Sequence, residues 1–141
     1  MTYTENYELN QWQKSDRIMM EDFNSDNAKI DAALAGLTKL AFGTYTGNDA
    51  ATRVITLPFT PKVVWLAHER GQTFYYSGTT HEYWGGLILA GAPIKDSNDN
   101  TVAAVVTNGF EVRFGSDLTE YYKQYWYTNR SDNTYRYFAL G

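Results

Sequence analysis

One amphipathic helix is predicted near the start of the chain, over residues 22–38. Its apolar positions are spaced alternately by four and three residues, and one polar residue completes the series. This spacing is typical of the seam of a coiled coil, where side chains on one stripe meet a partner helix. The predicted seam consists of Phe23, Asn27, Ile30, Leu34 and Leu37.

The ends of the helix and its packing partner are predicted from the same segment. Asp22 is expected to cap the N-terminus, because a carboxylate there can accept hydrogen bonds from the first backbone N–H groups. Gly36 marks the exit from the helix. The stripe is narrow, so the pattern fits a short helical bundle between chains as well as a helix lying on its own β domain. Periodicity does not decide between these two arrangements.

Residues 41–141 are predicted to form short strands. Aromatic and β-branched residues recur there between turn signals, and the helices of βαβ units are missing, which favours an antiparallel sandwich or small barrel. Asn108-Gly109 is the strongest hairpin signal, because both central residues of a type I′ turn need positive φ. The expected strands cover residues 42–46, 52–57, 62–69, 73–77, 83–90, 101–107, 110–114 and 134–140.

The first 15 residues show no period of either kind. Isolated aromatic residues such as Tyr7 and Trp12 lie among polar ones, which indicates an extended docking arm. The chain is therefore predicted to be mostly β, with an N-terminal arm and oligomerising helix in residues 1–41. An antiparallel β-sandwich-like domain is predicted in residues 42–141.

Charge and composition exclude several classes of function. The chain has 12 Lys and Arg against 16 Asp and Glu, a net charge of −4, which argues against binding to nucleic acid. It has no cysteine, so disulfides and thiolate metal sites are impossible. No apolar run approaches the roughly 20 residues of a membrane span, and the first residues lack the features of a signal peptide. We expect no membrane insertion and no classical secretion signal.

No pattern typical of catalysis or metal binding is found. His68 and His81 stand apart from any metal-ligand spacing. Asp96, Asn98 and Asn100 match the first ligand positions of an EF-hand loop, but the glycine and final glutamate of that loop are missing. A glycosidase would need two acids about 5–10 Å apart, and sequence does not give that distance. We expect neither enzymatic activity nor a cofactor or metal.

The most distinctive segment is residues 121–133. Aromatic side chains alternate there with amides, a carboxylate and a guanidinium, a combination that suits sugars, because rings stack on pyranose faces while planar polar groups bind hydroxyls. The same rings could instead pack the domain's own core or a contact between chains. The candidate ligand-binding residues are Trp126, Tyr125, Tyr127, Asn129, Arg130 and Asp132.

The order of short motifs resembles short tail fibres and receptor-binding proteins of bacteriophages. After an arm with Tyr and Trp, residues 21–24 read EDFN and residues 29–34 read KIDAAL, similar to the N-terminal segment of those proteins. The C-terminal part is similar to their fibre-tip domains in residues 43–47, 59–63, 108–112 and 135–141. Long fibres insert a shaft between these parts, and its absence favours a short unit on a baseplate.

This resemblance implies a homotrimer located in the virion, at the tail tip or baseplate, and assembled in the host cytoplasm. The N-terminal part would bind other tail or baseplate proteins, and the C-terminal part would bind a glycan on the host surface. A component of a phage-tail-like particle would look the same. The alternatives are a purely structural baseplate or tail adaptor protein and a carbohydrate-binding, lectin-like module.

Overall fold

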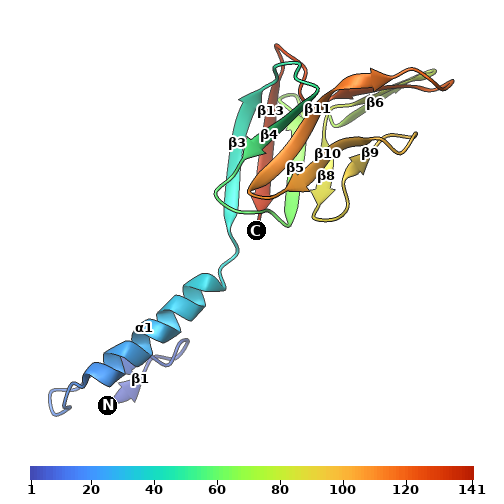
Figure 1. Cartoon of the computed structure of the whole chain (residues 1–141). Coiled ribbons are helices and arrows are strands. Elements are labelled where there is room, and N and C mark those ends of the chain that lie inside the picture. The colour runs from blue at the N-terminus through green and yellow to red at the C-terminus, as the bar shows by residue number, and fades with distance from the viewer. The chain divides into compact units, whose positions relative to one another are not determined.

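The computed structural model describes residues 1–141 and divides them into two compact units, residues 1–38 and 39–141. Figure 1 shows one helix in the first unit and a β structure in the second. The protein is mostly β, as the strand patterns predict.

The helix of the first unit, α1, spans Met20–Ala35. It begins two residues earlier than predicted, and its N-cap residue is Met19, which makes no side-chain capping bond. Asp22 therefore lies in the first turn, where its negative charge still favours the positive end of the helix dipole. The helix ends at Gly36, so Leu37 lies just beyond it and not on the helical seam.

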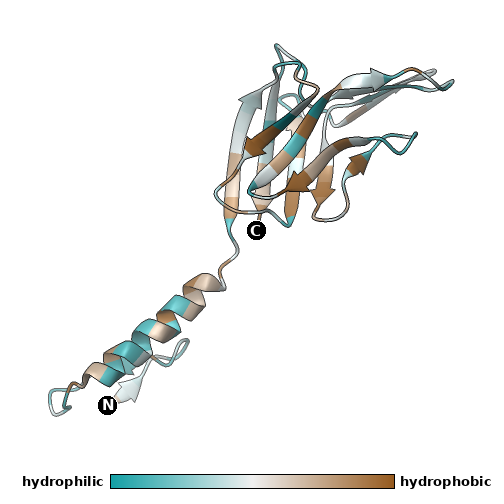
Figure 2. Cartoon of the chain, in the orientation of Figure 1, coloured by the Kyte–Doolittle hydropathy of each residue, from teal (hydrophilic) through white to brown (hydrophobic).

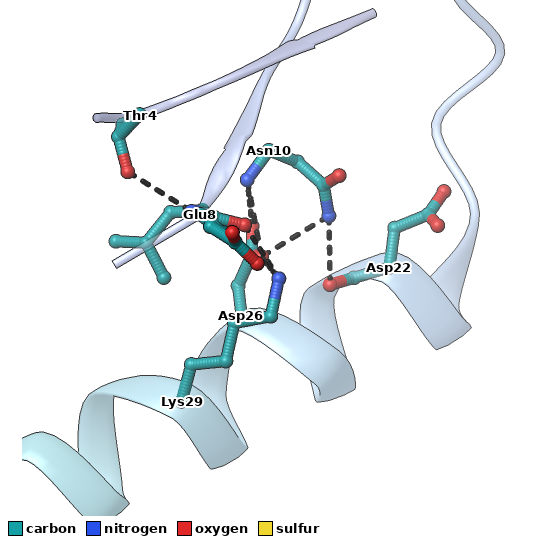
Figure 3. Close-up of polar contacts among 7 residues, drawn as sticks. Thr4, Glu8, Asn10, Asp22, Asp26 and Lys29 are labelled. Carbon is teal, nitrogen blue, oxygen red and sulfur yellow. Dashed lines mark hydrogen bonds and ion pairs between the residues drawn. The ribbon is translucent and has the colours of Figure 1, made fainter. Parts of the chain in front are cut away.

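The arm is a small β-hairpin and not an extended segment. Strands β1 (Thr2–Tyr3) and β2 (Asn10–Gln11) pair antiparallel, and the second contacts the helix. The Asn10 backbone N–H donates to the Asp26 carboxylate at 3.0–3.1 Å, and its side-chain amide donates to the Asp22 carbonyl and to Asp26 (Figure 3). Lys29 donates to the Glu8 carbonyl, as Figure 3 also shows. Strands of two residues are too short to show a period, which is why sequence did not reveal them.

The predicted seam residues all lie on the exposed surface of the first unit. Phe23 stacks on Trp12, with ring centroids 5.8 Å apart, and still remains half exposed. Ile30, Leu34 and Leu37 line a shallow hollow with Tyr7 and Ala33, and Asn27 is exposed as well. Association through this seam stays a prediction.

The second unit consists of two sheets. The larger has the order β6-β7-β12-β11-β10-β9, with β4 also paired to β11, and the smaller has the order β3-β13-β5-β8. All pairs are antiparallel except β7 with β12. The bounds are β3 Leu40–Thr46, β4 Thr52–Thr56, β5 Val63–His68, β6 Phe74–Ser77, β7 Thr80–Tyr83, β8 Gly86–Leu89, β9 Ile94–Lys95, β10 Thr101–Val106, β11 Gly109–Asp117, β12 Lys123–Tyr127 and β13 Thr134–Leu140.

The core lies between the two sheets. Alternate residues of β5, β8 and β13 face inward from the smaller sheet and pack with residues of β4, β10 and β11. Tyr45 and Tyr135 stack at the centre with ring centroids 4.9 Å apart, and Phe110 contacts Tyr45 edge-on. This arrangement is sandwich-like and buries the stripe that the alternation in β11 predicts.

The predicted hairpin at Asn108-Gly109 is present, with its turn shifted by one residue. Val106 pairs with Gly109, so the two turn residues are Thr107 and Asn108, and only Asn108 has positive φ. Gly109 serves a different purpose. A Cβ there would lie 2.3 Å from the Ile55 carbonyl oxygen, so glycine is needed for the close approach of β4 to β11.

Candidate functional site

Residues 115–133, predicted to be the longest region between strands, are partly strand. β11 extends to Asp117, and β12 occupies Lys123–Tyr127. Because side chains alternate along a strand, the aromatic residues of β12 point to opposite faces of the sheet. The predicted ligand-binding residues therefore do not form one cluster.

Tyr125 and Tyr127 lie on one face together with Arg130. The Arg130 guanidinium lies 4.7 Å from the centroid of the Tyr127 ring and 5.8 Å from that of Trp84. Tyr127 also packs on Phe114, with ring centroids 6.1 Å apart. The Tyr127 ring is thus covered by its own chain, which leaves little of it for a sugar.

Asn129 and Asp132 belong to a loop that is tied to the loop after β3. Asn129 is fully buried, and its amide donates to Asn48 Oδ1 at 2.7 Å and to the Ala50 carbonyl at 3.0 Å. Asp132 is exposed and has a positive φ of 59°. Burial gives Asn129 a structural position, out of reach of a ligand at the surface.

Core hydroxyls hold the start of the same loop. The Tyr45 hydroxyl donates to the Thr128 carbonyl, and the Tyr135 hydroxyl donates to the Tyr127 carbonyl. Burial raises the pKa of Tyr135 to about 12 and that of Tyr45 further, so both hydroxyls stay protonated as donors at neutral pH.

Trp126 lies on the opposite face and organises the turn between β9 and β10. Its indole N–H donates to Asp96 Oδ2 at 2.8 Å. Asp96 Oδ1 accepts the backbone N–H groups of Asn98 and Asn100, which folds residues 96–100 into a tight turn. Trp126 and Asp96 therefore fix the position of a polar loop above the sheet.

This loop forms one wall of a cavity of ≈ 550 Å³ at the tips of the strands. Figure 1 shows the β6–β7, β9–β10 and β11–β12 connections extending from the larger sheet, away from the end where β3 begins and β13 ends. Backbone hydrogen bonds between Lys39 and Gly141 close that other end. The cavity is lined by Ser97, Asn98, Asp117, Thr119, Glu120, Tyr121 and Tyr122.

The aromatic wall of the cavity is held by the strands beside it. Tyr122 stacks on His81 with ring centroids 5.4 Å apart and an interplanar angle of 16°. His81 in turn contacts Phe74 and Tyr76 of β6, and its Nδ1 pairs with Ser97 Oγ at 3.2 Å. These contacts orient the Tyr122 ring, and Tyr121, which is 73% exposed, stands edge-on against it.

Asp117 joins the two walls of the cavity. Its Oδ1 accepts the Thr119 hydroxyl and backbone N–H, and its Oδ2 accepts the side-chain amides of Asn98 and Asn100, both at 3.0 Å. These hydrogen bonds, led by the Thr119 hydroxyl, lower the pKa of Asp117 well below its usual value of 3.8. The carboxylate is therefore ionised and its acceptor positions are filled, so its role is to position Asn98 and Thr119.

Several polar groups of the cavity make no hydrogen bond within the chain. They are Asn98 Oδ1, whose amide nitrogen is turned toward Asp117, the Glu120 carboxylate, and the hydroxyls of Tyr121 and Tyr122. Two tyrosine rings lie beside these acceptors and donors. An exposed ring face next to fixed polar groups can stack on the C–H side of a sugar and bind its hydroxyl groups.

Most residues that line this cavity were not among the ligand-binding residues predicted from the sequence. Tyr121 and Tyr122 begin the aromatic segment, but Ser97 and Asn98 come from the turn whose match to an EF-hand loop is incomplete. The signal available in the sequence was the Asp96, Asn98, Asn100 spacing. It predicts a structured turn, but its contact with Asp117 depends on the pairing of β10, β11 and β12.

The structure offers no group of three or more metal-ligating side chains, and α1 is not long and apolar enough to cross a membrane. No family model, curated protein or solved structure was found to match this chain.

Proposed function

We propose that this protein is a receptor-binding protein of a bacteriophage tail or a phage-tail-like particle, and that it attaches to a glycan on the host surface. The observation that carries the proposal is the cavity, where the Tyr121 and Tyr122 rings lie beside unpaired polar groups of Asn98 and Glu120. The order of the sequence motifs supports the assignment to a phage particle. In this proposal the protein acts in the virion as a non-enzymatic homotrimer, and residues 1–38 bind other tail or baseplate proteins.

In this binding mode, one sugar ring stacks on the exposed ring of Tyr121, which stands edge-on against Tyr122, and Tyr122 is itself held by His81. The sugar hydroxyl groups donate to Asn98 Oδ1 and to the Glu120 carboxylate. Asp117 holds the Asn98 side chain in place before the ligand arrives, which lowers the ordering cost of binding. Several copies of the site in one particle would raise the avidity for a repetitive surface polymer.

The cavity lies on loops and strand tips, where binding residues commonly collect on a rigid scaffold. The face with Arg130 is a weaker candidate, because its guanidinium lies over the Tyr127 ring and reduces the surface left for stacking. A purely structural adaptor would not need the Asn98 amide, held by Asp117 with its oxygen unpaired, beside exposed rings.

The test is adsorption of the purified protein to host cells, together with binding to an array of bacterial surface glycans. The double variant Tyr121→Ala, Tyr122→Ala is expected to lose at least 10-fold in affinity, because each ring removed is an anchor of about 1–3 kcal/mol. The matched control is Tyr75→Ala, since Tyr75 is 48% exposed and points to the opposite face of the sheet. Unchanged binding by the folded double variant, or an equal loss in the control, would reject the assignment.

A further inference from the structure

The outer face of the smaller sheet has an unusual composition. In an antiparallel sheet with one face in water, the outward side chains are normally polar. Here, two adjacent cross-strand rows on the outer face consist only of apolar residues. One row is Phe42, Phe138, Trp65 and Leu87, and the other is Leu40, Leu140, Val63 and Leu89.

These side chains point away from the core. Their strand neighbours Ala41, Val64, Ile88 and Ala139 belong to the core or pack against it, so alternation directs the two rows outward. Phe42 is 72% exposed, and six of the eight side chains are at least 40% exposed. Figure 2 shows that β3 and β13 are most hydrophobic at the ends nearest Lys39 and Gly141, where these rows lie.

The larger sheet provides an internal comparison. On its outer face, Glu111 and Arg113 form an ion pair at 2.7 Å, and the outward residues of β4 include Thr52 and Thr56. That face also carries exposed apolar residues, namely Val54 opposite Glu111 and Phe74 and Tyr76 on β6, but polar and charged side chains lie between them. The smaller sheet differs because its two outward rows are apolar throughout.

We propose that copies of this chain associate through the apolar outer face of β3, β13, β5 and β8. The exposed area of the two rows supports association with a second copy. It is on the order of 600 Å² of apolar surface, near the ~800 Å² that each partner buries in a standard protein–protein interface. Monomeric proteins seldom leave a contiguous patch of that size uncovered.

The charge distribution is compatible with a second copy at this face. The chain has a net charge of −4, so copies repel one another at most surfaces. None of its 16 acidic residues lies in the four strands, which makes this face the one where like charges interfere least. The polar boundary starts at Thr44 and Arg136, directly beside the Phe42 and Phe138 pair. The association surface does not include the glycan cavity, so self-association and glycan binding are tested by different variants, although a monomeric chain would also count against the homotrimer of the proposed function.

The test is the mass of the full chain in solution, measured by light scattering after size exclusion at micromolar concentrations. The wild-type protein is expected to have a multiple of the chain mass of 16.1 kDa. Phe42→Asp and Leu87→Asp, on opposite edges of the face, are each expected to shift the mass toward one chain. Thr44→Asp is the matched control, because it places the same charge on the same face of β3 outside the apolar rows.

Circular dichroism establishes that each variant is folded, which the high exposure of Phe42 and Leu87 favours. Two variants at separate strands keep the test valid if one of them fails to fold. A monomeric wild-type protein would overturn the proposal, whatever else covers the face. So would folded variants at both positions that keep the wild-type mass, or a control that dissociates equally.

Discussion

The role of Asn129 gives the sharpest test of the loop after β12. The sequence suggests a ligand-binding amide, whereas the structure buries this side chain completely and uses its amide N–H groups to hold the loop that follows β3. We expect Asn129→Ala to lower stability and to leave the affinity of the folded protein for host glycans unchanged.

The size of the effect can be worked out from the contacts. Truncation removes two hydrogen bonds, each with a net value of about 1 kcal/mol, and leaves the Ala50 carbonyl without its partner. The Asn48 side chain is exposed and can turn to water, so its loss costs less. Asn129 Oδ1 has no hydrogen-bond partner in the folded chain, and removing this buried atom offsets part of the loss. We expect a net loss of about 1–2 kcal/mol, which corresponds to about 5–10 °C in Tm for a domain of this size.

The charge variant Asn129→Asp adds a second, pH-dependent measurement. The new carboxylate is buried, and one of its oxygens faces the Ala50 carbonyl oxygen, which is also an acceptor. The pKa of Asp at this position is therefore higher in the folded state than in the unfolded state. Because the folded variant binds a proton at a pH where the unfolded chain does not, the free energy of unfolding of this variant increases as pH falls. We therefore expect Asn129→Asp to melt below Asn129→Ala at neutral pH and to recover toward about pH 4.

Calorimetry or circular dichroism melting, in parallel with a glycan-binding assay, measures both effects. A Tm within about 1 °C of the wild-type value for Asn129→Ala would refute the structural role. Lost binding at an unchanged Tm would return Asn129 to the ligand site.

Two further outcomes test other parts of the β unit. Gly109→Ala should destabilise the unit by more than about 2 kcal/mol, because the added Cβ would lie 2.3 Å from the Ile55 carbonyl oxygen and push β4 away from β11. A chemical denaturation midpoint equal to the wild-type value would contradict this expectation. The Asp117 carboxyl, whose pKa is lowered by hydrogen bonds led by the Thr119 hydroxyl, should stay ionised as pH falls through its usual value of 3.8, as followed by carboxyl NMR shifts. The stability that it contributes is present above the unfolded pKa and is lost only as pH falls through the lower, folded pKa, so an ordinary titration midpoint would refute the hydrogen-bond arrangement.

Much of the β unit could be predicted from local patterns. The strand from Phe110 onward alternates apolar and polar residues, and the Asn108-Gly109 signal marks a hairpin that the structure contains with a shift of one residue. Both signals act between neighbouring residues, so sequence reveals them. The apolar spacing in α1 was likewise visible, although the start of the helix was not, because no side chain caps it.

The candidate site could be predicted only in its chemistry. The tyrosines and amides of residues 121–133 are visible in the sequence, but β12 divides its aromatic residues between two faces. The following loop packs against the loop after β3, which buries Asn129. The cavity joins the turn at Ser97 and Asn98 to Asp117 and Tyr122, and this contact exists only because β9, β10, β11 and β12 lie side by side in one sheet.

The apolar outer face of the smaller sheet likewise depends on tertiary structure and not on local sequence. The apolar residues at Phe42, Trp65, Leu87 and Phe138 are each unremarkable in the sequence, because a single exposed apolar side chain is common. Pairing places these four residues, from four separate segments, in one row across the sheet. Local sequence thus indicated many of the strands and the alternation of apolar and polar side chains along β11, but not β7, β9 or β12. Register, which joins residues as far apart as Phe42 and Phe138, decided which side chains share a surface, because it depends on the packing of the whole core.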